Sequence, residues 1–165
     1  YYYTITSVSA YGESAASAEV RGNALMPPAH IVIVVEENKD VGEIIGSSNA
    51  PYINSLVRQG ANFTDFHAIT HPSQPNYIAL FSGSTQGVTD NARTWSFAEP
   101  NLAKSLFDAG LSFTGYSENL PADGSQVTQA GDAQYPDLYT RNLNAMAQFT
   151  DAGTLPTGQP RPKLR

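Results

Sequence analysis

Three sets of polar residues in the first half of the chain are of types that could carry chemistry. Ser73 lies in the run His71–Tyr77 (HPSQPNY), Glu37 and Asn38 directly follow an apolar run, and Asn91 closes the segment GSTQGVTDN. A serine hydroxyl attacks a substrate only when a base or a metal ion removes its proton. A carboxylate and an amide oxygen side by side suit a hard cation. The three sets together favour a serine nucleophile that is activated by a cation rather than by histidine.

Ser73 has two competing interpretations. The Ser-x-Pro pattern is a common helix opening, in which the hydroxyl caps an N–H group and proline fits the first turn. The same position also places the hydroxyl at the positive end of a helix dipole, where unpaired N–H groups favour a bound phosphate. The pattern by itself indicates either a helix cap or a nucleophile beside an anion site.

Simpler explanations also exist for the other two sets. Glu37 and Asn38 fit the solvated end of a strand, and Glu36 competes with Glu37 because adjacent strand residues point to opposite faces. Asn91 is of a type common in ordinary turns. Beside Ser73, however, its amide would be a donor for a phosphoryl oxygen that gains negative charge.

Hydrophobic periodicity predicts alternating strands and helices around these residues. Strands are expected at residues 31–35, 61–69 and 111–116, the first of them buried on both faces of a parallel sheet. Helices are expected at residues 51–57, 74–82 and 102–109, with a weaker helical pattern at 138–149. The first helix is expected to have its cap at Ser48 or Asn49 and Gly60 as the terminator that follows it, and the third is expected to be ended by Gly110. This rhythm is typical of an α/β sheet, whose ligands bind beyond the carboxyl ends of the strands.

Composition narrows the classes of protein. The 165 residues carry a net charge of −6, and three of the nine basic residues lie in the last five positions, so the body of the chain is more acidic than the total and unsuited to a nucleic-acid groove. No apolar run is long enough to span a membrane. Cysteine is absent, so any metal would be held by oxygen or imidazole ligands.

The first residues alternate aromatic or β-branched side chains with small polar ones, which predicts a strand over the first eight positions and a second strand at 18–21. This hairpin resembles the last two strands of a fibronectin type III domain. Such a domain needs about seven strands. The resemblance therefore implies that the chain begins inside a domain.

Residues 30–121 resemble the phosphoesterase family, which includes acid phosphatases and nonspecific phospholipases C and belongs to the alkaline-phosphatase-like superfamily. The resemblance is carried by Glu37-Asn38 after the first strand, by HPSQPNY, by GVTDN and by GLSFTGYSENLP at 110–121. It implies an α/β fold, namely the N-terminal half of a mostly parallel sheet flanked by helices and preceded by the short β-hairpin. The expected domains are residues 1–22, a linker at 23–29, a partial phosphoesterase domain at 30–150 and an irregular tail at 151–165.

The resemblance also implies roles for individual residues. Ser73 would be the nucleophile that becomes phosphorylated, Glu37, Asn38 and Ser73 would bind a divalent metal ion (Zn, Mg, Mn, Ca or Fe), and Asn91 would contact the substrate phosphate. Residues expected to support the site rather than to react are His71, Asn76 and Tyr77.

The chain departs from the family pattern in its last third. Residues 139–145 (YTRNLNA) keep the tyrosine, the arginine (Arg141) and the asparagine (Asn144) of a family motif but lose its histidine and proline. The family's second group of aspartate and histidine metal ligands is absent. We therefore expect the missing C-terminal half of the domain to complete the site, and this chain to be inactive alone.

The function that follows is a metal-dependent phosphoric-ester hydrolase, of the acid-phosphatase type, with a small phosphate ester as substrate. The alternatives are a phospholipase C-type phosphodiesterase and a non-catalytic surface or adhesion module. The resemblance implies a secreted or cell-surface protein.

Overall fold

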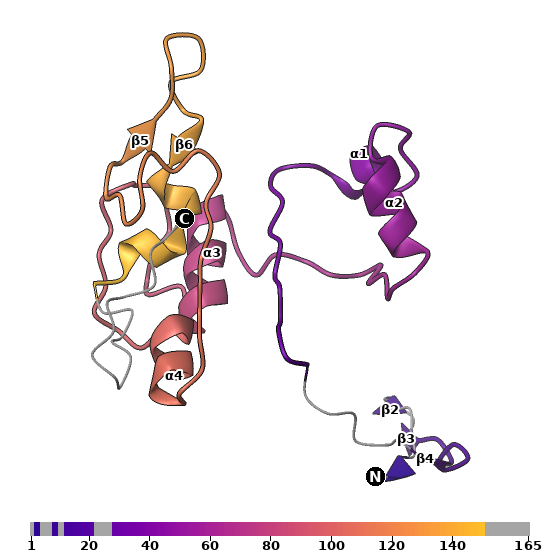
Figure 1. Ribbon diagram of the computed structural model, residues 1–165. Helices are drawn as coiled ribbons and strands as arrows, with labels where there is room; N and C mark the ends of the chain where they lie inside the picture. The colour runs from indigo at the N-terminus through magenta and orange to yellow at the C-terminus, as the bar shows by residue number, and fades with distance from the viewer. Residues whose placement is uncertain (1, 4–7, 10–11, 22–27, 151–165) are drawn as a thin grey trace. The chain divides into compact units, whose positions relative to one another are not determined.

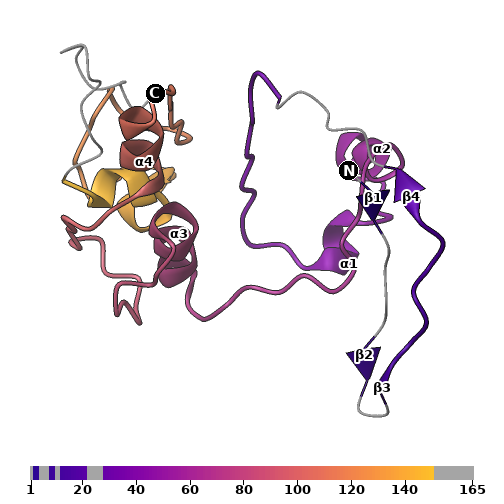
Figure 2. The ribbon, with the colours of Figure 1, turned by 90° about the horizontal axis from the view of Figure 1, so that it is seen from below.

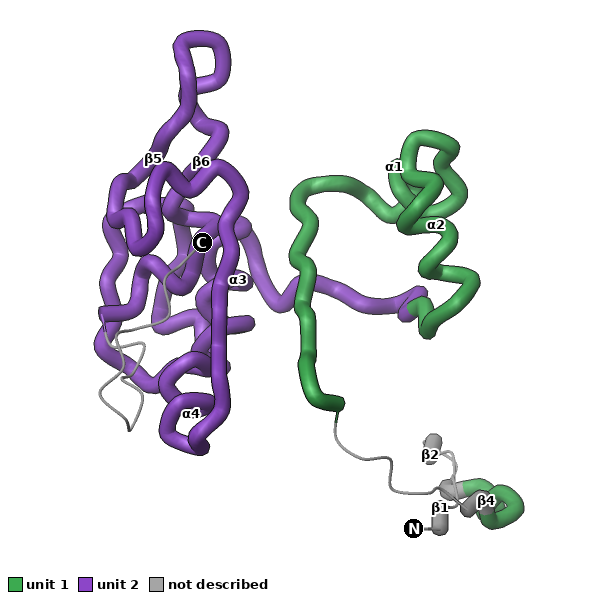
Figure 3. The backbone as a smooth tube through the Cα atoms, in the orientation of Figure 1, with its two compact units in different colours: residues 1–62 green, residues 63–165 purple. Residues whose placement is uncertain are grey.

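The computed structural model describes residues 2–3, 8–9, 12–21 and 28–150. The chain divides into two compact units, residues 1–62 and 63–165, each of which is described by itself (Figure 3). Most of the predicted linker and the whole predicted tail lie outside the described residues. The predicted domain boundaries stay a prediction.

Short antiparallel strand pairs open the first unit. Strand β1 (Tyr2–Tyr3) pairs with β4 (Val20–Arg21), and β2 (Val8–Ser9) pairs with β3 (Gly12–Glu13), so the chain folds back on itself here (Figure 2). The resemblance to a fibronectin hairpin stays a prediction.

Two helices complete the first unit. Helix α1 (Val41–Ile44) was not predicted, whereas α2 (Pro51–Val57) has the predicted bounds. The predicted cap of α2 at Ser48 or Asn49 is wrong, because Ala50 occupies the N-cap position. The preceding turn is held from inside the helix, since the Asn54 side chain donates to the carbonyl oxygens of residues 44, 47 and 50 and accepts from the N–H of residue 46.

The predicted buried strand at residues 31–35 is not formed. This segment has no strand partner among the described residues, and its side chains are exposed, from 49% for Val35 to 81% for Val32. A strand exists only through hydrogen bonds to a neighbour. The β-branched run indicates that the segment favours burial, but it does not supply the partner. The predicted parallel sheet is therefore absent from the described residues, whose named strands all pair antiparallel.

The second unit contains two helices that are in contact with each other, and in the view of Figure 1 the later one lies below the earlier one (Figures 1 and 2). Helix α3 (Ser73–Ser82) starts one residue earlier than predicted and ends at Gly83, whose φ of 76° is the left-handed conformation that glycine adopts without strain. Helix α4 (Leu102–Asp108) begins after Asn101, whose side chain accepts from the N–H of Lys104 at 3.1 Å.

The remaining elements of the second unit are short. Strand β5 (Gln129–Ala130) pairs antiparallel with β6 (Tyr139–Thr140), and two 3₁₀ helices follow, η1 (Arg141–Leu143) and η2 (Ala145–Gln148), both of which contact α3. They replace the weak helix predicted at 138–149. The strands predicted at 61–69 and 111–116 are also corrected, because neither segment forms a strand.

The core of the second unit lies between α3, α4 and η2. Phe149 is its centre, with ring centroids 5.3 Å from Phe81 and 5.4 Å from Phe97. Backbone hydrogen bonds join residue 97 to residues 148 and 150 at 2.8 Å. This aromatic cluster packs the end of the described chain against α3, so residues far apart in sequence belong to one hydrophobic core.

The packing of this core predicts how the stability of α3 changes when a buried side chain is shortened. Replacing the buried Phe81 by alanine should cost about 3–5 kcal/mol, because a large ring is lost from a closed cluster. Amide hydrogen exchange across α3 should then accelerate by about 10²-fold or more if it follows unfolding of this unit. The matched control is Leu80→Ala on the same helix, since Leu80 is 54% exposed. Equal exchange in the two variants would contradict this core.

Candidate active site at the N-terminus of helix α3

The start of α3 offers few free N–H groups. An α-helix leaves four N–H groups without partners inside the helix, here at positions 72–75. Pro72 and Pro75 carry no N–H, and the N–H of Gln74 donates to Oδ1 of Asn91. The start of α3 therefore has fewer backbone donors than the four of an ordinary helix, and binding of a phosphate at this end stays a prediction. Ser73 itself lies in the first turn of α3, at N1 rather than at the predicted cap position.

Asn91 is brought directly to this helix end. Its Oδ1 accepts a hydrogen bond from the N–H of Gln74 at 3.0 Å, although the two residues are 17 positions apart. Because a backbone N–H needs an acceptor, this bond fixes which side-chain atom is oxygen. The Nδ2 group is then available as a donor at the start of α3, since it makes no hydrogen bond in the described part of the chain. The structure thus joins Asn91 to the residue that follows Ser73.

The turn that carries Asn91 is held by its neighbour. Asp90 accepts hydrogen bonds from Nε1 of Trp95 at 2.9 Å and from the N–H of Ala92 at 3.0 Å. Both bonds lower the pKa of the Asp90 carboxyl below its ordinary value, and the bond from Trp95 has the larger effect. Asp90 therefore stays ionised in mildly acidic solution and keeps the turn in place.

Asn76 holds the loop that leads into the helix. Its Oδ1 accepts from the N–H groups of Ile69 and Thr70, both at 3.1 Å, and its Nδ2 donates to the carbonyl oxygens of Thr70 at 2.8 Å and Pro72 at 3.0 Å. The sequence predicts a supporting role for Asn76, and these are the contacts of such a support. Tyr77 packs partly buried against the core, whereas His71 is exposed.

A buried amide pair beneath Ser73 is missed by the sequence reasoning. Gln74 and Gln148 are both fully buried, and Nε2 of Gln74 donates to Oε1 of Gln148. The pair ties the first turn of α3 to η2. The sequence contained one weak signal, a glutamine directly after the serine of HPSQPNY, but no spacing rule links it to residue 148.

The altered family motif at 139–145 lies in the same network. Nδ2 of Asn144 donates to the Tyr139 hydroxyl at 3.3 Å, and the Arg141 guanidinium donates to the carbonyl oxygen of Ala147 at 2.8 Å. Burial raises the pKa of the Tyr139 phenol, so its hydroxyl stays neutral. The three retained motif residues therefore shape the loop that carries Gln148.

The predicted metal ligands are divided between the two units. Glu37 and Asn38 belong to the first unit and Ser73 to the second, and Asn38 has a left-handed φ of 70°. Within the described residues, no three histidine, aspartate or glutamate side chains gather as a metal centre. The grouping of Glu37, Asn38 and Ser73 therefore stays a prediction. Their oxygen donors suit a hard divalent cation, but they are fewer than such an ion needs.

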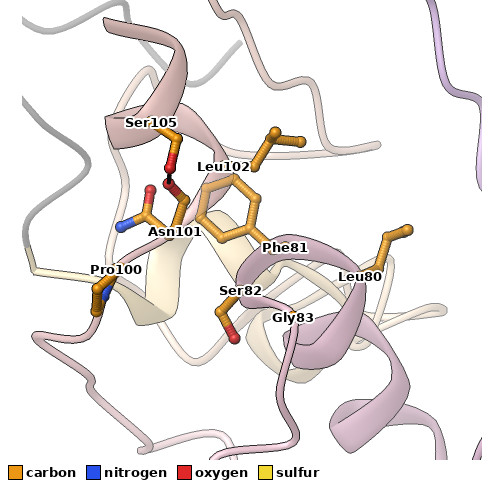
Figure 4. Close-up of a pocket in the computed structure, with 8 residues that line it drawn as sticks. All are labelled: Leu80, Phe81, Ser82, Gly83, Pro100, Asn101, Leu102 and Ser105. Carbon is orange, nitrogen blue, oxygen red and sulfur yellow. Dashed lines mark hydrogen bonds between the residues drawn. The ribbon is translucent and has the colours of Figure 1, made fainter. Parts of the chain in front are cut away.

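A shallow hollow of about 260 Å³ lies at the other end of α3 (Figure 4). Residues from the last turn of α3 and the start of α4 line it, and Ser105 donates to the carbonyl oxygen of Asn101 at 3.0 Å. Leu80, the first lining residue along α3, is seven residues or about 10 Å of helix away from Ser73. The hollow is separate from the candidate active site.

Comparison with known proteins identifies the family. The model of the phosphoesterase family matches residues 47–158, which is more than half of the chain. The chain belongs to the phosphoesterase family. The matched range contains Ser73, Asn76 and Asn91, whereas Glu37 and Asn38 precede it.

Several curated proteins are similar to the chain. It is 51% identical over 110 residues to phosphatidylinositol-3-phosphatase from Mycobacterium tuberculosis, which covers 66% of the chain and 37% of that protein. It is 30% identical over 159 residues to a probable acid phosphatase from Kluyveromyces lactis, which covers 90% of the chain and 36% of that protein. An acid phosphatase from Aspergillus fumigatus is 30% identical over 115 residues, covering 68% of the chain and 25% of that protein. The chain thus spans about a third of the length of these relatives or less.

No solved structure matches the chain significantly. Within the described residues, no helix has both the length and the apolar character needed to cross a bilayer.

The contacts of Asn76 predict that its replacement changes amide exchange in the loop that leads into α3. Asn76→Ala should accelerate amide exchange at Ile69 and Thr70 about tenfold or more, because both N–H groups lose their acceptor. Asn76→Asp keeps that acceptor and should preserve most of the protection. Asn49→Ala, at an exposed position in the other unit, is the control. Unchanged exchange at residues 69 and 70 in Asn76→Ala would show that the loop does not depend on this side chain.

Proposed function

We propose that the protein containing this chain is a phosphoric-ester hydrolase in which Ser73 is the nucleophile. The observation that carries the proposal is that Ser73 is the first residue of α3 and that Asn91 is hydrogen-bonded to the next residue, Gln74. Membership of the phosphoesterase family supports it, as do the names of the relatives, which are all phosphatases.

Each residue of this group has a chemical task in the proposal. Ser73 attacks phosphorus, so a bond from its Oγ forms as the bond to the leaving alcohol breaks, and water later cleaves the phosphoserine. Nδ2 of Asn91 donates to a phosphoryl oxygen while negative charge builds on it. The N–H of Gln74 donates to Oδ1 of the same side chain, which polarises the amide and strengthens Nδ2 as a donor. The positive end of the α3 dipole favours the same charge.

The proposal includes a divalent cation, with Glu37, Asn38 and Ser73 as its ligands from this chain. When bound, such an ion would favour loss of the proton from a coordinated hydroxyl. The described residues form no complete metal centre, so further ligands would have to come from elsewhere in the protein.

The substrate class in the proposal is a phosphate monoester. Two of the relatives compared above are named as acid phosphatases, and the M. tuberculosis relative is named for a phosphoinositide monoester. These names favour a phosphatase over a phospholipase C-type diesterase. Hydrolysis of phosphatidylcholine in preference to simple monoesters would reverse that choice.

Replacement of the nucleophile gives the direct test. In the full-length protein, Ser73→Ala should lower hydrolysis of a chromogenic phosphate monoester by at least about 10³-fold, because no other group can form the covalent intermediate. Ser84→Ala, in the exposed loop after α3, should leave the rate unchanged. A chelator should abolish the wild-type rate, and added divalent metal should restore it. Full activity of Ser73→Ala would overturn the assignment.

Asn91 allows the helix cap to be separated from the phosphate contact. Asn91→Asp keeps an oxygen for the Gln74 N–H but loses the Nδ2 donor and adds negative charge. Asn91→Ala loses both and should also destabilise the start of α3 by about 1 kcal/mol. Both variants should lower kcat by about 10²-fold or more. If Asn91→Asp retained wild-type kcat, Asn91 would act only as a cap.

A further inference from the structure

The buried amide pair under the candidate active site has a defined direction. Nε2 of Gln148 donates to the carbonyl oxygens of Arg141 at 2.9 Å and Asn144 at 3.4 Å. Its Oε1 therefore faces Gln74, which has to present its own Nε2. The orientation of both amides follows from these fixed carbonyl groups.

Gln74 connects this buried pair to the reacting end of α3. Its side chain is bonded to Gln148, its backbone N–H is bonded to Oδ1 of Asn91, and its peptide bond joins it to Ser73. Gln74 is thus hydrogen-bonded both to the loop at 141–148 and to Asn91, and it is covalently joined to Ser73. Asn91 and Ser73 are the two residues that contact the phosphate in the proposed function.

The polarity of Gln74 is costly for the fold. Its Oε1 is buried and has no hydrogen-bond partner among the residues that the structure describes. A buried acceptor without a partner destabilises the fold, whereas an apolar side chain of similar shape would avoid that cost. Packing alone therefore does not account for a glutamine here.

We infer that Gln74 and Gln148 are positioning residues that fix the first turn of α3, and with it Ser73 and Asn91, for reaction. The inference rests on the proposed function of Ser73. Both side chains are fully buried, so they act through the backbone of α3 rather than on the substrate.

The physical basis is the directionality of hydrogen bonds. An amide pair restricts rotation of the first turn about the helix axis, whereas apolar contacts are non-directional and permit small rotations. A displacement of about 1 Å at a reacting group can lower the rate about 10²-fold while binding changes little.

The test compares one single and one double variant in the full-length protein. Gln74→Met leaves Gln148 without its partner, whereas the double variant Gln74→Met, Gln148→Met removes both polar groups and keeps the volume. Removing both partners is close to neutral for stability. The carbonyl oxygens of residues 141 and 144 keep their bonds from the N–H groups of residues 144 and 147. The readouts are kcat, KM and amide exchange at residue 74 and in the core turn at residues 78–81.

We expect the double variant to retain wild-type exchange at residues 78–81 and KM within about twofold. Its kcat should fall about tenfold or more, and exchange at the N–H of residue 74 should accelerate, because that amide reports the bond to Asn91. Wild-type kcat and unchanged exchange at residue 74 would overturn the inference and make the pair purely structural. Failure of the proposed function is distinguishable, since it appears as hydrolysis by the wild-type protein that Ser73→Ala does not reduce.

Discussion

The hydrogen bond between the Gln74 N–H and Oδ1 of Asn91 is the constraint on which the candidate active site depends. Two prolines remove donors from the start of α3, so a side chain from a later loop takes the place of a local cap. The bond joins the loop after α3 to the first turn and leaves the Nδ2 group of Asn91 as a donor. A helix start that is poor in N–H groups thereby gains a donor of fixed orientation.

The rest of the second unit holds in place the two segments that this bond joins. The aromatic cluster around Phe149 holds η2 against α3, and η2 carries Gln148 to the buried side of the same first turn. Asn76 restrains the entering loop from the other side. Hydrophobic packing brings the segments together, and the directional amide contacts then determine their orientation.

Signals within a short segment predict the main helices well. The features that these signals miss depend on contacts between residues far apart in sequence. Helix α2 has its predicted bounds because Pro51 and its apolar spacing are signals within one short segment. Residues 31–35 fail as a strand because pairing needs a neighbour that the run itself cannot specify. In the candidate site, Ser73 and Asn91 are recognisable from the sequence motifs that contain them. The partner of Gln74 lies 74 positions away, and no periodicity predicts it.

The most direct measurement of the central claim is the position of the phosphoryl group during turnover. The full-length protein would be mixed with a phosphate monoester, quenched in acid within the first turnovers, digested and analysed by mass spectrometry. The account predicts phosphoserine at Ser73 and nowhere else in the chain. Hydrolysis that proceeds with the phosphoryl group on another residue, or with no phosphorylated intermediate at all, would contradict it.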